Sequence, residues 1–198
     1  MHNNLLKIIY FEINTFLIYL LYVMKTLTIF CSGKTGIKEK YIQSINKLIS
    51  SLDTDKIQIA YGGGNVGLMG VVRDAFLYKG GKIITSNIHK FTIDGMLDDY
   101  LYDNITERQS KLIELGDIFL ALPGGYGTIY ELLEVITKNQ IEEISKEVII
   151  YNYNGIYDYL LKQMDKLREE GFIKHDLDWY KIKIFTDEVE LCNYINNL

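Results

Sequence analysis

The only proline of the chain opens the segment PGGYGTIYE at residues 123–131. An apolar run at residues 118–122 precedes this segment, and apolar residues at helical spacing follow it. A buried strand, a glycine turn and the start of a helix are therefore predicted in this order. Because the N–H groups at the start of such a helix are unpaired and lie at the positive end of its dipole, the turn is a candidate anion site.

From Met24 onward the pattern alternates between strand-like and helix-like segments. Strands are predicted at residues 25–31, 56–61, 82–86, 100–105, 117–122, 147–153 and 182–185. Helices are predicted at residues 38–51, from the glycine turn 62–70 to about 79, and at 106–115, 128–139, 155–170 and 187–196. This alternation predicts one α/β domain over residues 24–198, a Rossmann-like, doubly wound parallel sheet with helices on both faces. Ligands of such sheets bind outside the carboxyl ends of the strands, where the glycine turns fall.

Residues 1–23 form an apolar extension of uncertain status, interrupted by Lys7, Glu12 and Asn14. Its cleanest apolar part, residues 16–23, is too short to cross a bilayer. The alternatives are an extension from an upstream start site, a native helix packed on the domain or a partner, and a membrane or export segment. We expect no membrane association and a cytoplasmic protein, because the two cysteines are far apart and suit a reducing compartment.

Charge and residue spacing exclude several function classes. The formal net charge of −5 argues against general nucleic-acid binding, which needs a basic surface, but leaves room for a single nucleotide. The three histidines are scattered, and nothing has metal-ligand spacing. We therefore expect no nucleic-acid partner and no metal site.

A second glycine turn, GGGNVGLMG, occupies residues 62–70. Its letters match the GxGxxG fingerprint of dinucleotide binding, but it follows the second strand, and the next strand ends in no acid that could bind ribose hydroxyls. The alternatives are NAD binding, a tight turn that lets helix and sheet approach, and backbone contact with a nucleotide without NAD geometry. We favour the last.

Glu131 lies one helical turn inside the predicted anion site. Thr128-x-x-Glu131 has the spacing of a capping box, so the carboxylate could cap the helix or do chemistry. The glycines before it permit positive φ and leave no Cβ between backbone and ligand. No lysine follows, so the segment is not a triphosphate P-loop. Thr128 could give its hydroxyl to a phosphate.

Arg108 is predicted at the start of the preceding helix, at the same edge of the sheet, so it could reach the same cleft. Its alternative role is a surface ion pair with Glu107 or Asp103, which would contribute little. Cys31 ends the first strand, but no histidine is placed to activate it, and a small buried residue is expected there. Glu134 shares the helix face of Glu131 and is interpreted as a helper or as solvated.

Both glycine motifs resemble the LOG ("lonely guy") family, with PGGYGTIYE similar to its PGGxGTxxE signature and GGGNVGLMG similar to its GGGxxGLMG turn. Arg108 falls where the family has its arginine, and the resemblance covers about residues 24–172. It implies a phosphoribohydrolase that cleaves the N-glycosidic bond of a cytokinin riboside 5′-monophosphate or AMP, giving free base and ribose 5-phosphate. It also implies a homodimer and no cofactor. Members are often mislabelled lysine decarboxylases, but no lysine here is placed to carry pyridoxal phosphate.

The resemblance implies Arg108 and Glu131 as the catalytic pair. The implied substrate-binding residues are Ser32, Gly33, Gly63, Gly64, Met69, Gly124, Gly125, Gly127 and Thr128, the last four holding the 5′-phosphate on their N–H groups. Ile105 and Gln109 replace a family methionine and lysine, which leaves the preferred base open. The rival functions are a nucleotide or molybdenum-cofactor carrier of the same fold and, less favoured, an NAD-dependent oxidoreductase.

Overall fold

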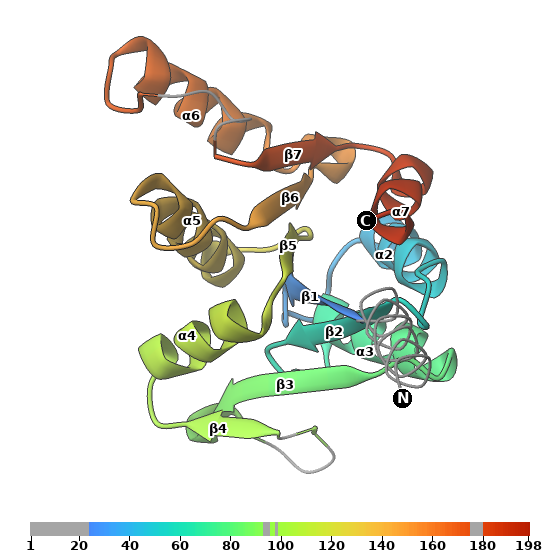
Figure 1. Ribbon diagram of the computed structural model, residues 1–198. Helices are drawn as coiled ribbons and strands as arrows, with labels where there is room; N and C mark the ends of the chain where they lie inside the picture. Colours follow the sequence, from blue (N-terminus) through green and yellow to red (C-terminus); the bar gives the residue numbers. More distant parts are fainter. Residues whose placement is uncertain (1–23, 93–95, 98, 175–179) are drawn as a thin grey trace, which may run out of the picture.

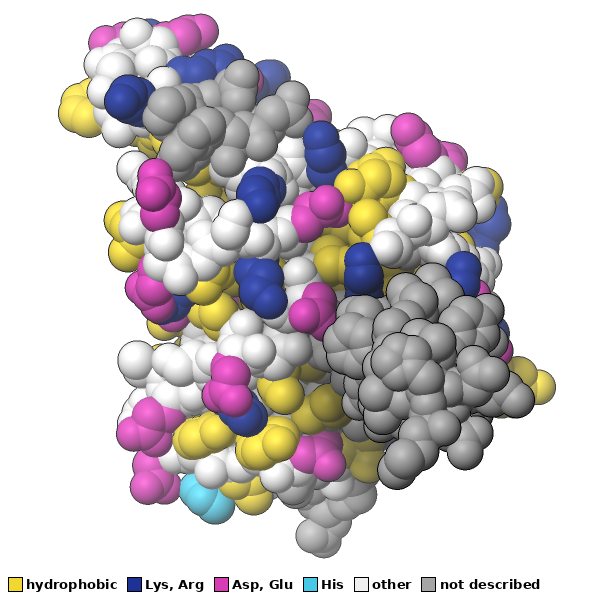
Figure 2. Space-filling model, viewed as in Figure 1, with side chains coloured by type: hydrophobic (Ala, Val, Ile, Leu, Met, Phe, Trp, Pro, Cys, Tyr) yellow, Lys and Arg dark blue, Asp and Glu magenta, His cyan; other side chains and the backbone are white. Residues whose placement is uncertain are grey.

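The computed structural model describes residues 24–92, 96–97, 99–174 and 180–198 (Figure 1). The apolar extension at residues 1–23 lies outside the described residues. Within the described residues, no helix is long and apolar enough to cross a membrane. On the face seen in Figure 2, acidic and basic side chains are interspersed over the surface.

Seven strands form one sheet in the order β4-β3-β2-β1-β5-β6-β7, and every neighbouring pair is parallel. The strands are β1 (Lys25–Phe30), β2 (Ile57–Tyr61), β3 (Ile83–Ile88), β4 (Tyr100–Tyr102), β5 (Ile118–Ala121), β6 (Glu147–Tyr151) and β7 (Ile182–Phe185). The predicted parallel α/β fold is confirmed. The strand order reverses between β1 and β5, which makes that junction the switch point where ligands of doubly wound sheets bind.

Helices cover both faces of the sheet (Figure 1). They are α2 (Glu39–Ser50), α3 (Gly67–Tyr78), α4 (Ile105–Leu115), α5 (Tyr126–Gln140), α6 (Asp158–Glu169) and α7 (Glu188–Asn196), with short 3₁₀ turns at His89–Phe91 and Tyr153–Gly155. One buried cluster joins the sheet to α2, α3 and α7, and a second joins it to α4, α5 and α6. The two clusters are the two hydrophobic layers of a three-layer domain.

The central strand β1 is buried on both faces of the sheet. Leu27 and Ile29 belong to the cluster under α2, α3 and α7, whereas Phe30 belongs to the opposite one. Thr28 is also fully buried, and its hydroxyl donates to the Leu112 carbonyl of α4 at 3.2 Å. Strands covered on both faces need apolar or internally paired side chains throughout, and β1 meets this need.

Candidate functional site

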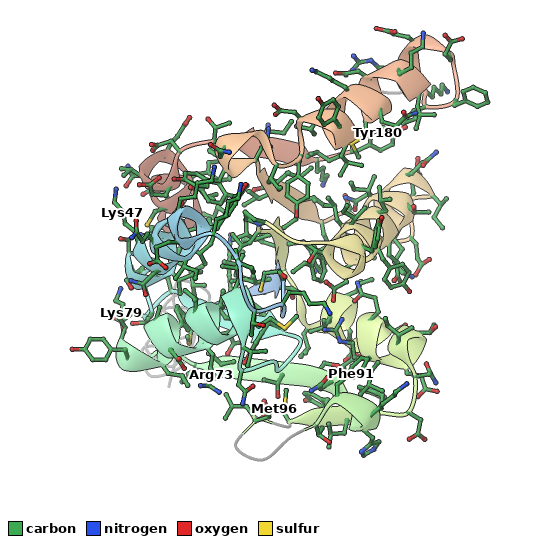
Figure 3. The ribbon with its side chains drawn as sticks, turned by 180° about the vertical axis from the view of Figure 1, so that it is seen from behind. Lys47, Arg73, Lys79, Phe91, Met96 and Tyr180 are labelled. Atoms are coloured by element: carbon green, nitrogen blue, oxygen red, sulfur yellow. The ribbon has the colours of Figure 1, made fainter. Side chains whose placement is uncertain are left out.

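A cavity of about 640 Å³ opens at the carboxyl ends of the strands, beside the β1–β5 switch point. This volume is within the range of small-molecule sites. Its lining comprises Cys31, Ser32, Gly33, Lys34, Gly62, Gly64, Asn65, Val66, Met69, Asn87, Ile88, Phe91, Met96, Ile105, Arg108, Gly125, Tyr126, Gly127, Thr128 and Glu131. Figure 3 shows Phe91 and Met96 at the β3–β4 side of the sheet.

Arg108 and Glu131 form a buried ion pair in the cavity wall. Nη1 of Arg108 donates to Oε1 of Glu131, and the two residues are only 7% and 6% exposed. Arg108 is held from a second side, because its Nε donates to the Ser86 carbonyl at 3.0 Å and its own carbonyl accepts from the Ser86 hydroxyl at 3.1 Å. The alternative of a surface ion pair for Arg108 is therefore wrong.

The start of α4 explains why Arg108 reaches the cavity. Asn104 is the N-cap residue, and its side-chain oxygen accepts from the Glu107 backbone N–H at 2.9 Å. This cap fixes the first turn of the helix beside β3 and places Arg108 on the face turned to the sheet, where Leu112 lies one turn further. The predicted edge location of Arg108 is confirmed.

Burial sets the electrostatics of the pair. Desolvation raises the pKa of the Glu131 carboxyl above its ordinary value of 4.5, while the Arg108 guanidinium opposes the rise. Burial also raises the pKa of the Cys31 thiol, which is 2% exposed, so that this side chain stays a neutral thiol. Cys31 is thus the small buried residue expected, although it also lines the cavity. The cavity lining thus holds one cation and one carboxylate in direct contact, Arg108 and Glu131, with Lys34 as a further cation of the lining.

Gly62 makes room for the guanidinium. A Cβ built on this residue would lie 2.2 Å from Nη2 of Arg108, closer than van der Waals contact permits. We expect Gly62→Ala to displace Arg108 and to break its contact with Glu131. The rate of turnover should then fall far more than the fraction of folded protein. Steady-state kinetics of the variant and the parent protein, measured beside their thermal unfolding, would check this. Normal turnover by Gly62→Ala would contradict it.

The helix after the PGG segment starts earlier than predicted. α5 begins at Tyr126 with Gly125 as the N-cap residue, and no side chain caps it. Thr128 is the third helical residue, and Glu131 pairs with Arg108 across the cavity instead of with the start of its own helix. The capping-box interpretation of Glu131 is therefore wrong. The extended backbone of Gly125 lets the helix begin two residues sooner.

The glycines of the PGG segment serve a different purpose from the one expected. Positive φ angles occur at Gly63 and Gly67 of the second turn but at none of Gly124, Gly125 and Gly127. A Cβ on Gly124 would lie 2.1 Å from the Thr128 hydroxyl, so packing requires this glycine. A Cβ on Gly125 or Gly127 would meet no atom within 4 Å, so packing does not require glycine there. Their bare backbone faces open space.

The first intrahelical bond of α5 runs from the Ile129 N–H to the Gly125 carbonyl at 3.0 Å. The N–H groups of Tyr126, Gly127 and Thr128 therefore have no partner within the helix, and they lie at its positive end. All three residues line the cavity. This helix start is able to hold an anion on backbone donors, as the sequence predicted.

Most other predicted site residues meet at this cavity. Ser32, Gly33, Gly64 and Met69 line it, and the Met69 N–H donates to the Ser32 carbonyl at 3.2 Å, which joins the first and second turns. Gly63 and Gly124 do not line it. The buried Tyr157 hydroxyl donates to the Leu122 carbonyl at 2.6 Å and is also bonded to the Gly124 backbone. Gly124 thus supports the turn from behind.

The prediction missed the wall that β3 contributes. β3 continues two residues beyond its predicted end, to Ile88, and brings Asn87 to the cavity, followed by Phe91 and Met96. A polar run, Thr85 to Asn87, at the carboxyl end of a strand was the available signal. Among the described residues, no group of histidine, cysteine and acidic side chains could hold a metal ion.

Comparison with known proteins gives both family and fold. Residues 69–195 match a family model described as "Possible lysine decarboxylase". The chain is 36% identical over 156 residues to cytokinin riboside 5′-monophosphate phosphoribohydrolase LOG5 of Arabidopsis thaliana, covering 76% of this chain and 68% of the relative. It is 33% identical to the cytokinin riboside 5′-monophosphate phosphoribohydrolase of Rhodococcoides fascians, covering 75% and 78%.

Among solved structures, the chain is similar to the molybdenum cofactor carrier protein of Chlamydomonas reinhardtii, with a TM-score of 0.66, 15% identity, and coverage of 88% of this chain and 98% of the other. The molybdenum cofactor binding protein of Rippkaea orientalis has a TM-score of 0.64 at 15% identity, with 88% and 97% covered. At this identity the likeness shows the shared Rossmann-type fold. From the family match and the close relatives together, this chain belongs to the LOG family, the family whose model carries the lysine decarboxylase description.

Proposed function

We propose that this protein is a phosphoribohydrolase, which cleaves the N-glycosidic bond of AMP or a cytokinin riboside 5′-monophosphate into free base and ribose 5-phosphate. The observation that carries the proposal is the buried ion pair of Arg108 and Glu131, which faces the same cavity as the unpaired N–H groups at the start of α5. The named activity of the relatives supports it. The protein needs no cofactor or metal in this proposal.

The 5′-phosphate binds the start of α5 in this proposal. The N–H groups of Gly127 and Thr128 and the positive end of the helix dipole favour a dianion there. The open space above Gly125 and Gly127 is where the phosphate oxygens would approach the backbone. Glu131 lies one turn further along the helix, so a phosphate held at its start brings the ribose over the carboxylate.

Glycoside cleavage passes through a transition state with positive charge on C1′ and the ring oxygen. The Glu131 carboxylate stabilises this charge and orients the water whose oxygen bonds to C1′. The electrons of the C1′–N bond leave with the base, which gains a proton in place of the one that the water loses. Arg108 favours the ionised form of Glu131 against the effect of burial and holds the carboxylate in place, and its Nη2 would contact ribose or phosphate. Ser32, Gly33, Gly64 and Met69 also line the cavity and would contact the ribose and the base.

Incubation with AMP and with isopentenyladenosine monophosphate, followed by chromatography, tests the proposal. Release of adenine or isopentenyladenine together with ribose 5-phosphate is the expected result. Binding without release would favour a carrier function instead, which the shared fold of the molybdenum-cofactor proteins makes the relevant rival. An absorbance change that depends on nicotinamide would favour an oxidoreductase.

Gly127→Ala separates the ligand role of the α5 turn from its structural role. The methyl would meet no protein atom and sits in a helix without positive φ, so we expect unchanged or slightly increased stability, by about 0.4–1 kcal/mol. The same methyl would stand in front of the phosphate, so KM for AMP should rise about tenfold or more. Binding of adenosine, which has no phosphate, is the control and should change little. Equal weakening of adenosine and AMP would place the phosphate elsewhere.

We also propose a cytoplasmic homodimer. The free, buried cysteines Cys31 and Cys192 suit a reducing compartment. Beside the cavity mouth, apolar side chains of α4 and α5 are exposed, among them Tyr126, Ile105, Tyr130 and Leu133. Burial of such a patch between two subunits would remove it from water. Light scattering during size-exclusion chromatography should give twice the mass of 23.0 kDa, and a monomer at micromolar concentration would contradict this.

A further inference from the structure

Asn87 has a buried donor that the described protein leaves unpaired. The residue is 4% exposed, lies next to last in β3 and lines the cavity. Its Oδ1 accepts from the Ile88 backbone N–H at 2.8 Å, while its Nδ2 finds no hydrogen-bond partner among the described residues. Buried amide groups are nearly always paired, so this donor calls for an explanation.

The orientation of the amide is fixed by its surroundings. Turning it over would set the NH₂ group against the Ile88 N–H, donor against donor, so the oxygen must face Ile88. The NH₂ side lies beside Gly63: a Cβ built there would be 3.4 Å from Nδ2 and 3.3 Å from the Leu97 carbonyl oxygen, but Nδ2 makes no hydrogen bond to this or any other described acceptor. The NH₂ group is therefore a fixed donor that stays unpaired in a side chain of the cavity lining.

Strand order places Asn87 at the far end of the cavity from α5. β3 lies three strand spacings from β5, or roughly 14 Å, across the sheet edge. A nucleotide with its phosphate at the start of α5 and its ribose over Glu131 would extend its base toward β3. The lining residues that follow Asn87 along the chain, Ile88, Phe91 and Met96, are apolar, as suits a flat aromatic base.

We infer that Asn87 is a specificity-determining residue, whose Nδ2 donates to a ring nitrogen of the purine base. This inference rests on the proposed function for the orientation of the nucleotide. A donor that is unpaired in the free protein selects for a ligand with an acceptor at that point, because any other base leaves it unpaired. Asn87 would set the relative affinity for different bases and would take no part in bond cleavage.

The test compares ligands that differ by one ring nitrogen. Binding of AMP, of its 1-deaza, 3-deaza and 7-deaza analogues and of ribose 5-phosphate is measured by calorimetry in a Glu131→Gln background, which prevents turnover. One deaza analogue should bind about tenfold or more weakly than AMP. In Asn87→Leu this difference should disappear, because the contact is already absent. Ribose 5-phosphate, which has no base, should bind equally to both proteins.

Asn87→Asp provides the second variant. It keeps the oxygen that accepts from Ile88 N–H and replaces the free donor by an acceptor, so the preference for AMP over the critical deaza analogue should likewise vanish. Deaza effects that are the same with and without Asn87, or ribose 5-phosphate binding that falls as much as AMP binding, would overturn the inference. Base release by the parent protein is scored separately, so a failed hydrolase proposal and a failed role for Asn87 give different results.

Discussion

Replacement of Glu131 by glutamine should abolish base release from AMP while the protein still folds and binds the nucleotide. Glutamine has the same shape and can still accept from Arg108, but it carries no negative charge to stabilise the cationic ribose. Loss of such an interaction lowers turnover by about 10²–10⁴-fold. The measurement is adenine release under single-turnover conditions, beside calorimetric binding of AMP.

The matched control for this variant is Glu134→Gln, one turn further along α5 and outside the cavity lining. Turnover by this control should stay within a fewfold of the parent. If Glu131→Gln released adenine at the parent rate, the carboxylate would have no part in the chemistry and the proposed mechanism would fail.

Removal of Arg108 should be the most destabilising single change in the site. Arg108→Ala leaves the 6% exposed carboxylate of Glu131 without its cation, and breaking a buried ion pair in this way costs about 3–5 kcal/mol. It also loses the bond from Nε to the Ser86 carbonyl, whereas the bond from the Ser86 hydroxyl to the main-chain carbonyl of residue 108 remains. We expect a large drop in the free energy of denaturant unfolding together with loss of base release. Arg168→Ala, at a more exposed ion pair with Asp165, should change stability by less than about 1 kcal/mol.

A second substitution identifies the cause of that loss. Glu131→Gln added to Arg108→Ala removes the uncompensated charge and should recover much of the lost stability. The stability of Arg108→Ala should also depend on pH with a definite sign, because burial raises the pKa of Glu131 and the Arg108 guanidinium opposes this rise in the parent protein. Without Arg108 the folded state holds the proton more tightly, so Arg108→Ala should be more stable near pH 5 than at pH 7. A double variant no more stable than Arg108→Ala would show that the arginine acts through packing alone.

The layer architecture was predictable because each strand is a short apolar run bounded by glycine or a polar turn, and each helix keeps one apolar face. The runs around Leu27, Leu120 and Ile149 are buried from both sides, as their uninterrupted apolar pattern indicates. The length of β3 was not predictable, because its end is polar. Ser86 and Asn87 are buried, and the Ser86 hydroxyl bonds the Arg108 carbonyl of α4, a contact that only the folded protein provides. Tertiary contacts outweigh strand propensity there.

The site was predictable as a set of segments but not as a set of contacts. The order of segments along the chain placed Arg108 and Glu131 at one edge of the sheet. The spacing of Thr128 and Glu131, however, fitted a helix cap equally well. The choice depends on Gly125 taking an extended N-cap conformation and on Gly62 leaving space for a guanidinium from another element. Neither backbone geometry nor side-chain reach between separate elements is encoded in local periodicity, so both needed the folded structure.

The hydroxyl of Tyr157 connects the segment before α6 to the turn before α5. This side chain, 2% exposed and positioned just before α6, bonds the backbone on both sides of Pro123. This turn is thereby joined to the start of α6, although no described residue of α6 lines the cavity. Substitutions that loosen α6 would therefore act at a distance, and amide hydrogen exchange at Ile129 should speed up when α6 detaches.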